Sequence, residues 1–218
     1  MLQHFNFAEI IIEFLVLLFS LTVHESAHAW MAWRLGDPTG RLLGRVSLNP
    51  AVHVDPVGTV LFPLLAMVTR LPLIGWAKPV PVDILKLKNY RRDFMLIAAA
   101  GPAANLALAV VGAIAYRLAA WGLGDAGGVL NMSSTLLLLS LTLLELNLLL
   151  AVFNMLPVPP LDGGNVLAGL LPERIATVLD TLRPYGFIIL YALIFTGVLM
   201  RVVRMSAYIT YQLLTWPL

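Results

Sequence analysis

The sequence predicts an all-α polytopic membrane protein with about four transmembrane helices, and three observations support this fold class. Of the 218 residues, 60% are hydrophobic and only 12% are charged, about half the charged fraction of a typical soluble domain. Four apolar segments reach the length of about 20 residues that a helix needs to cross a bilayer. Basic residues gather in two of the intervening loops, as in cytoplasmic loops of membrane proteins. We expect one domain over residues 1–218.

The first apolar segment is expected to remain in the protein as a span. The opening residues, MLQHFNFAEI, lack the basic start of a cleavable signal peptide, and no cleavage site of the A-x-A kind follows. Each of the other three segments also has the length of a transmembrane helix. The four predicted spans are residues 7–33, 94–118, 132–156 and 184–203.

A fifth apolar segment, residues 57–76, is interrupted by Pro63, Arg70 and Pro72. Such a segment is better explained as a re-entrant or interfacial hairpin than as a span. If it does not cross, 11 of the 14 lysines and arginines lie on one side of the membrane. The positive-inside rule then places the loops 34–93 and 157–183 in the cytoplasm and both termini outside.

The stretch SLTVHESAHAWMAW, residues 20–33, places two histidines and a glutamate in the first apolar segment. His24 and His28 are four residues apart, so on a helix they project from one face. With Glu25 they form H-E-x-x-H, in which two histidines bind zinc and the glutamate takes a proton from metal-bound water. Each charge within a span costs roughly 2.5–3.5 kcal/mol, which makes chance a poor explanation. A polar cluster joining helices and a proton relay are the alternatives.

A catalytic zinc ion needs a third protein ligand and one open position. The chain has no cysteine, so the third ligand must be a histidine or a carboxylate. Asp162 follows a proline-rich turn after the third span and precedes two glycines, which allow the chain to aim the carboxylate back at the bundle. The alternative is that Asp162 only caps the helix that begins near Asn165.

The motifs of this chain resemble those of the site-2 protease family of intramembrane zinc metalloproteases. The similar segments are HESAH (24–28), FNMLPVPPLDGG (153–164), AAAGPAAN (98–105) and GWAKPVPV (75–82). The last of these is typical of the short prokaryotic branch, which lacks PDZ and cystathionine-β-synthase-type domains. In this chain Met155 follows Asn154 where the family pattern has proline.

The resemblance implies one zinc ion with a bound water, held by His24, His28 and Asp162, with Glu25 as the general base. It implies substrates that are single membrane-spanning helices of other proteins, cut within or near the bilayer in regulated intramembrane proteolysis. It also implies a multi-pass protein of a prokaryotic cell membrane. His28 lies six residues, about 9 Å, from Arg34, so we expect the active site nearer the cytoplasmic side. The net charge of +2 gives no indication of a nucleic-acid partner, and the oligomeric state stays open.

Two further residues are candidate substrate-binding groups. Asn154 could bond the unwound substrate or the oxyanion, or it could tie its own helix to the proline-rich turn. His53 could serve as an oxyanion group, although a structural hydrogen bond is the simpler explanation. In the segment 75–82 the alternating prolines favour short extended strands near the active site, which could pair with the substrate or brace a loop.

Two other classes of protein remain possible. A proton-coupled transporter would use His24, Glu25 and His28 as a relay, and it would not need to retain zinc. An inactive scaffold would bind membrane helices without cutting them, but such a protein has no need of the base Glu25.

Overall fold

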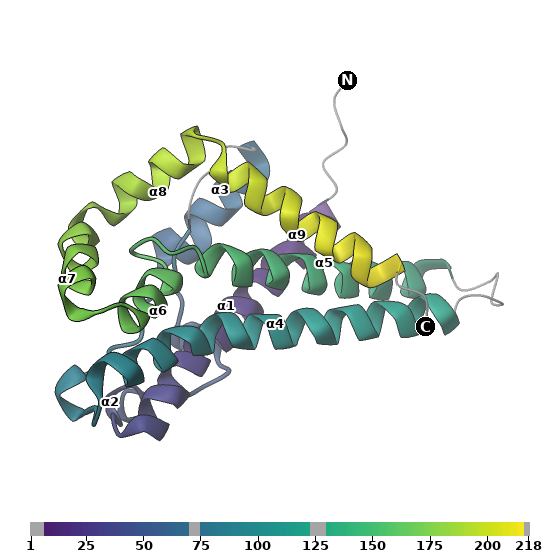
Figure 1. Cartoon of the computed structure of the whole chain (residues 1–218). Coiled ribbons are helices and arrows are strands. Elements are labelled where there is room, and N and C mark those ends of the chain that lie inside the picture. The colour runs from purple at the N-terminus through teal and green to yellow at the C-terminus, as the bar shows by residue number, and fades with distance from the viewer. Residues whose placement is uncertain (1–6, 70–74, 123–129, 216–218) are drawn as a thin grey trace.

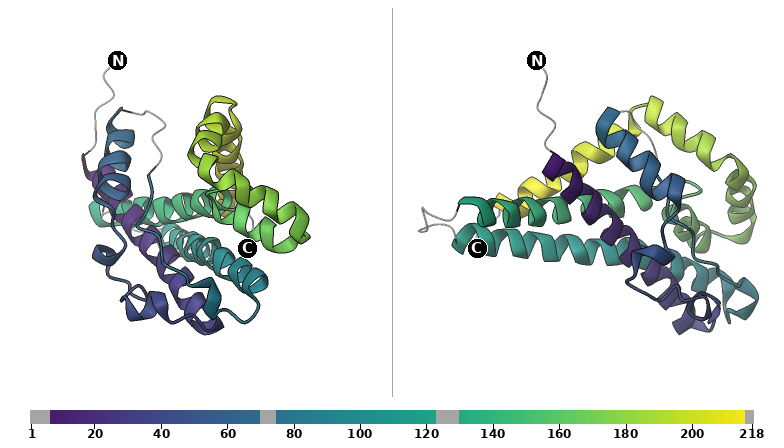
Figure 2. Two further views of the ribbon diagram at one scale, coloured as in Figure 1. Left: turned by 90° about the vertical axis from the view of Figure 1, so that its left-hand side faces the viewer. Right: turned by 180° about the vertical axis from the view of Figure 1, so that it is seen from behind.

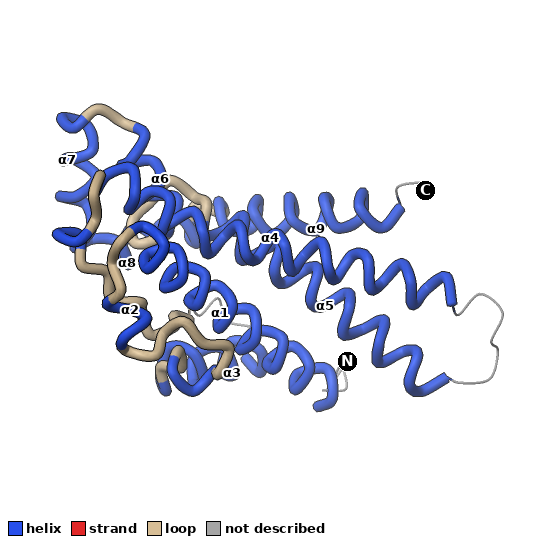
Figure 3. The backbone as a smooth tube through the Cα atoms, turned by 90° about the horizontal axis from the view of Figure 1, so that it is seen from below, coloured by secondary structure: helices blue, strands red, loops and turns tan. Residues whose placement is uncertain are grey.

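The computed structural model describes residues 7–69, 75–122 and 130–215, and it shows helices and loops with no β-strand among these residues (Figures 1 and 3). The all-α polytopic fold class is therefore confirmed. Four helical stretches are long and apolar enough to cross a membrane. The described α-helices are α1 (Phe7–Leu35), α2 (Thr39–Leu42), α3 (Phe62–Thr69), α4 (Tyr90–Gly122), α5 (Leu130–Asn154), α6 (Asp162–Leu170), α7 (Glu173–Leu182), α8 (Gly186–Phe195) and α9 (Val198–Thr215).

The long helices α1, α4 and α5 form the centre of the bundle; the first two predicted spans lie within α1 and α4, and the third, 132–156, runs two residues past the end of α5. Ala109 and Ala113 of α4 pack against Leu144 and Leu148 of α5. At Gly112 an added Cβ would lie only 2.6 Å from the Leu144 backbone nitrogen. Small residues on α4 thus let the two backbones approach closely, as is common between membrane helices.

The fourth predicted span, residues 184–203, does not form one helix. Helix α8 ends at Phe195, and Gly197 has a φ of +76° before α9 begins at Val198. Glycine adopts this left-handed conformation without steric cost, so it ends helices readily. The prediction was wrong at this point because the apolar run continues past the turn. The stretch long enough to cross a membrane is instead Glu173–Phe195.

The segment 57–76 leaves and re-enters the fold at the same place. The chain departs through a π-helical turn, Pro56–Leu61, followed by α3. On return, the Trp76 N–H donates to the Gly58 carbonyl oxygen at 3.0 Å, and the Thr59 hydroxyl donates to the Trp76 carbonyl oxygen at 2.8 Å. The two ends of the segment are therefore adjacent, as in a hairpin, and the re-entrant or interfacial course stays a prediction. Helices α3 and α8 project from the same side of the bundle (Figure 2), and the rings of Trp76 and Phe187 are in contact there.

The short extended strands expected near the active site are not present as paired strands among the described residues. The segment 75–83 is irregular and is held along one edge only. The Lys78 N–H donates to the His53 carbonyl oxygen at 2.8 Å, and the buried Arg45 guanidinium donates to the Lys78 carbonyl oxygen at 3.2 Å. Pro79 and Pro81 have no N–H to donate, which limits any ladder on the opposite edge, the one they share with Ala77.

Asp37 joins the end of α1 to the segment that leads into α4. Its fully buried carboxylate accepts hydrogen bonds from the Thr39 N–H at 3.0 Å, the Thr39 hydroxyl at 2.5 Å and the Asp83 N–H at 2.7 Å. Burial raises the pKa of Asp37, but these hydrogen bonds and the charge of Lys86 outweigh it and hold the pKa below its usual value.

We expect Asp37→Asn to destabilise the protein by about 1–3 kcal/mol at pH 7, because hydrogen bonds to a charged acceptor are lost. Because the folded-state pKa is lowered, the stabilisation is present above the unfolded pKa, near 3.9, and is lost as the pH falls through the folded value. In detergent, the difference in unfolding temperature between wild type and variant should therefore become smaller below pH 4. A difference that does not change with pH would contradict this account.

Candidate metal centre

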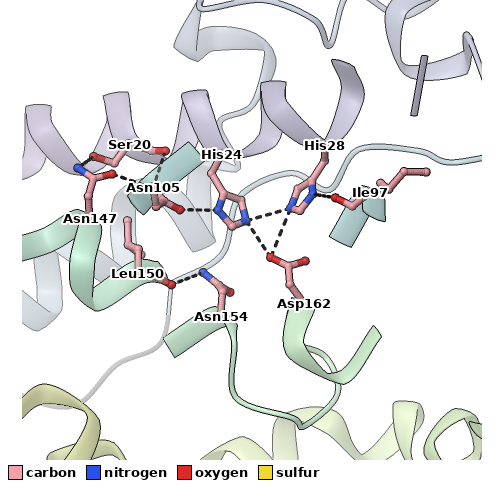
Figure 4. A network of polar contacts seen from close by, with 9 residues as sticks. All are labelled: Ser20, His24, His28, Ile97, Asn105, Asn147, Leu150, Asn154 and Asp162. Atoms are coloured by element: carbon pink, nitrogen blue, oxygen red, sulfur yellow. Dashed lines mark hydrogen bonds and ion pairs between the residues drawn. The ribbon is translucent and has the colours of Figure 1, made fainter. Parts of the chain in front are cut away.

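Along one face of α1 and one face of α4, residues spaced four apart lie opposite each other. The two helices run in opposite directions. The His28 Nδ1 donates to the Ile97 carbonyl oxygen at 2.7 Å. One turn away, the His24 Nδ1 donates to the Asn105 Oδ1 at 2.6 Å. Both imidazoles are buried. Because each Nδ1 is occupied by an acceptor from α4, both Nε2 atoms point to the same side of α1 (Figure 4).

Asp162, the first residue of α6, brings its carboxylate to these two nitrogens. Its Oδ2 lies 3.1 Å from the His24 Nε2 and 3.4 Å from the His28 Nε2, and the two Nε2 atoms are 3.0 Å apart. The sequence placed these three side chains in one site, and the structure brings them together (Figure 4).

A tight turn after α5 sets the position of Asp162. Leu161 is extended and precedes the helix, and α6 then begins at Asp162. Gly163 lies so close to the carbonyl oxygens of Met155 and Leu156 that a Cβ there would overlap them. At the other end of α6, the Arg91 guanidinium of α4 donates to the Ala168 carbonyl oxygen at 3.0 Å. Both ends of the helix that carries the carboxylate are therefore fixed to the rest of the site.

The donor set fits a metal ion. A neutral histidine whose Nδ1 carries the proton has a free lone pair on Nε2. The Asp162 Oδ2 is buried and has no hydrogen-bond donor among the described residues. Three electron-rich atoms thus converge at separations of 3.0–3.4 Å. Ligands bound to one tetrahedral zinc ion at 2.0–2.2 Å lie about 3.3 Å from each other, so the spacing matches such an ion.

Gly101 forms the wall of the site behind the two imidazoles. A Cβ added at Gly101 would lie 2.5 Å from the His28 Nε2 and 2.6 Å from the His24 Nε2. No such role was expected for Gly101 from the sequence, so this wall residue was missed. The available signal was its spacing, since Gly101 stands four residues before Asn105 and shares its helix face.

Glu25 faces the cavity that contains the three converging atoms. The cavity has a volume of about 1030 Å³, and its wall is mostly apolar. Glu25 is half-buried, next to His24 in the chain. The other lining residues include Leu21, Trp76, Ala77, Pro79, Val80, Phe94, Leu150, Phe153, Asn154, Phe187, Leu190 and Tyr191.

The two candidate substrate-binding residues have different positions. Asn154 lines the cavity, and its Nδ2 donates to the Leu150 carbonyl oxygen at 3.0 Å, so its Oδ1 takes no part in this bond (Figure 4). His53 is not among the residues that line the cavity. Its Nε2 lies 3.0 Å from the Ser47 carbonyl oxygen. The structure therefore places His53 in a loop brace and not beside the metal ligands.

The fold and the site together define a polytopic membrane metallopeptidase of the His-Glu-x-x-His type. The model of Peptidase family M50 matches residues 123–196, which include Asn154 and Asp162. The chain belongs to this family, the site-2 protease family, as its similarity to full-length relatives also shows.

The relatives are bacterial proteins. The chain is 37% identical over 183 residues to "Putative zinc metalloprotease YwhC" of Bacillus subtilis. The aligned region covers 84% of this chain and 79% of that protein. It is 32% identical to "Putative zinc metalloprotease Rip2" of Mycolicibacterium smegmatis and 31% identical to the Rip2 of Mycobacterium tuberculosis. Those two matches cover 84% and 81% of this chain but only 66% and 63% of the relatives. No solved structure shows a significant match to the chain.

Proposed function

We propose that the protein is a zinc-dependent intramembrane endopeptidase that cuts transmembrane helices of other membrane proteins in regulated intramembrane proteolysis. The observation that carries the proposal is the convergence of the His24 Nε2, the His28 Nε2 and the Asp162 Oδ2 between apolar helices. The printed names of the relatives, each a "Putative zinc metalloprotease", support zinc as the metal.

The residues of the site divide the chemistry between them. A zinc ion bound there would lower the pKa of a coordinated water and polarise a carbonyl group. His24, His28 and Asp162 would hold the ion with a fourth position open to the cavity. Glu25 accepts the proton of the attacking water and delivers it to the leaving amine. Asn154 lines the cavity, and its amide oxygen, which is not used in the bond to Leu150, would contact the substrate backbone.

The cavity suits an apolar segment that has lost its helical hydrogen bonds. Trp76 and Lys78 use their backbone groups to bond the loop around residues 53–59. In an extended chain, the backbone N–H and C=O groups of successive residues point to opposite sides of the chain. The backbone of Ala77, which lines the cavity, is thus turned to the open edge, where an unwound substrate would pair with it by strand addition.

We expect Ala77→Pro to lower kcat/KM for a transmembrane substrate by roughly 10-fold, because one backbone donor of about 1–1.5 kcal/mol is lost. Zinc content should stay at that of the wild type, since Ala77 is not one of the proposed ligands. Ala77→Ser keeps the backbone N–H and serves as the matched control. Equal kcat/KM for the proline and serine variants would show that this edge does not bind substrate.

We further propose that the site opens toward the cytoplasm of a bacterial cell. Support comes from the basic loop 34–93, which follows the motif helix. α2, which belongs to this loop, and α6, which carries Asp162, lie at one end of the bundle (Figure 1). Water would then reach Glu25 from the side of that end.

The experiment uses the full chain, purified in detergent and reconstituted in liposomes with a panel of single-span substrates. We expect about one zinc ion per chain and cleavage within the apolar segment, mapped by mass spectrometry of the products. Chelation should stop cleavage and added zinc should restore it. A chain that retains no zinc supports the transporter reading, and a zinc-loaded chain that cuts none of the panel supports the scaffold reading. Either result contradicts the proposal.

A further inference from the structure

A chain of buried amides leads from the backbone of α5 to His24. The Asn147 Nδ2 donates to the Leu143 carbonyl oxygen and to the Ser20 hydroxyl, both at 2.8 Å. The Asn105 Nδ2 donates to the Asn147 Oδ1 at 2.8 Å, and the Asn105 Oδ1 accepts from the His24 Nδ1 at 2.6 Å. Ser20, Asn105 and Asn147 have no exposed surface, and Figure 4 shows them in line behind His24.

The direction of each hydrogen bond in this chain follows from its backbone end. The Leu143 carbonyl oxygen can only accept, so the Asn147 NH₂ must face it and the Asn147 Oδ1 must face Asn105. Asn105 therefore turns its NH₂ to Asn147, and this group also lies 3.4 Å from the Ser20 carbonyl oxygen. The Asn105 Oδ1 is left facing His24, whose Nδ1 must then carry the proton.

The two histidines differ in how their tautomers are set. The His28 Nδ1 faces the main-chain carbonyl oxygen of Ile97, which can only accept a hydrogen bond. The His24 Nδ1 faces a side-chain amide, which would present its NH₂ donor in place of its oxygen if the amide flipped. With a donor there, the His24 proton would move to Nε2, the atom that faces Asp162.

We propose that Asn105 and Asn147 are positioning residues that lock His24 in the Nδ1–H tautomer and so keep its Nε2 free to bind the metal. The inference rests on the proposed zinc site. Because the three side chains come from α1, α4 and α5, the metal affinity of His24 depends on the assembly of all three helices. Partners that orient metal-bound histidines in this way typically change metal affinity 10- to 100-fold when removed.

A purely structural role would make Asn105 a link between helices, and two variants separate the roles. Asn105→Leu removes both the acceptor for His24 and the donor to Asn147. Asn105→Asp keeps an acceptor for His24 but loses the donor to Asn147. A positioning role predicts that the aspartate variant retains zinc affinity, whereas a packing role predicts that both variants fail alike.

The test measures zinc affinity by competition with a chromophoric chelator, together with ¹⁵N spectra of histidine-labelled, metal-free protein. We expect Asn105→Leu to weaken zinc binding about 10- to 100-fold and Asn105→Asp to remain within a few-fold of wild type. Asn147→Leu, which contacts no ligand, should give a smaller loss because the Ser20 carbonyl oxygen still orients Asn105. The spectra should show the Nδ1–H tautomer of His24 in wild type and a second tautomer in the leucine variants.

Ser140→Ala is the matched control, because Ser140 is buried on α5 and bonds only its own helix, donating to the Leu136 carbonyl oxygen at 2.7 Å. It should lower thermal stability without changing zinc affinity or the His24 tautomer. Unchanged zinc affinity in both Asn105→Leu and Asn147→Leu would overturn this inference and leave the proposed proteolysis standing. A wild type that binds zinc but cuts no substrate would overturn the proposed proteolysis, while the tautomer spectra would still decide the role of the amides.

Discussion

Gly101→Ala should abolish zinc binding and with it proteolysis, although the substitution adds a single methyl group. The new Cβ would lie 2.5–2.6 Å from the two Nε2 atoms, whereas non-bonded heavy atoms prefer about 3.5–4.0 Å. The imidazoles would have to move by about 1 Å, and metal ligands tolerate only about 0.2 Å. We therefore expect zinc affinity to fall by about 100-fold or more, measured as zinc per chain after dialysis against a weak chelator.

The control for this prediction is Gly112→Ala on the same helix. There the added Cβ would meet the backbone of Leu144 on α5, so the variant crowds the helices away from the metal site. It should lower the unfolding temperature and leave one zinc ion bound. Wild-type zinc content and activity in Gly101→Ala would show that the site does not form against α4 as described.

The second large effect is expected for Glu25→Gln. The amide is nearly isosteric but cannot accept the proton of the attacking water, and general-base catalysis typically contributes 10²- to 10⁴-fold. We expect kcat to fall by about that factor while the zinc content stays at one ion per chain, because Glu25 is not among the three converging ligand atoms. Single-turnover cleavage of a reconstituted substrate, with zinc measured on the same sample, checks both parts.

Glu13→Gln provides the comparison for Glu25→Gln, since Glu13 lies on the same helix, is exposed and is not among the residues that line the cavity. It should retain wild-type kcat. If Glu25→Gln loses zinc together with activity, its carboxylate is a ligand, and the division of roles proposed above is wrong.

Local sequence patterns were enough to predict most of the fold and the three side chains that converge at the site. The first three predicted spans correspond to α1, α4 and α5, the third running two residues past the end of its helix. A helix that crosses a bilayer needs a long apolar segment, and such segments are visible without knowledge of their partners. His24 and His28 share a face because they are one turn apart on one helix. Asp162 was identified because prolines and glycines around it require a turn at membrane depth.

The misjudged elements depended on single residues whose effect is set by their surroundings. The predicted span 184–203 ignored Gly197, whose positive φ ends α8, and hydropathy alone does not report backbone conformation. The expected strand at 75–82 has hydrogen bonds on one edge and no partner strand among the residues that the structure describes. His53 lies in a loop brace, the simpler of the two explanations that its sequence position offered.

The sequence by itself determined that this is a membrane protein with apolar spans, one histidine pair on a helix face and a carboxylate aimed by a turn. Only the tertiary structure decided that Gly101 is the wall of the site and that Asn105 and Asn147 stand behind His24. The physical reason is distance along the chain. His24 and Asn105 are 81 positions apart, and Ser20 and Asn147 are 127 apart, so their contacts follow from how α1, α4 and α5 pack and leave no periodic signal in any one segment.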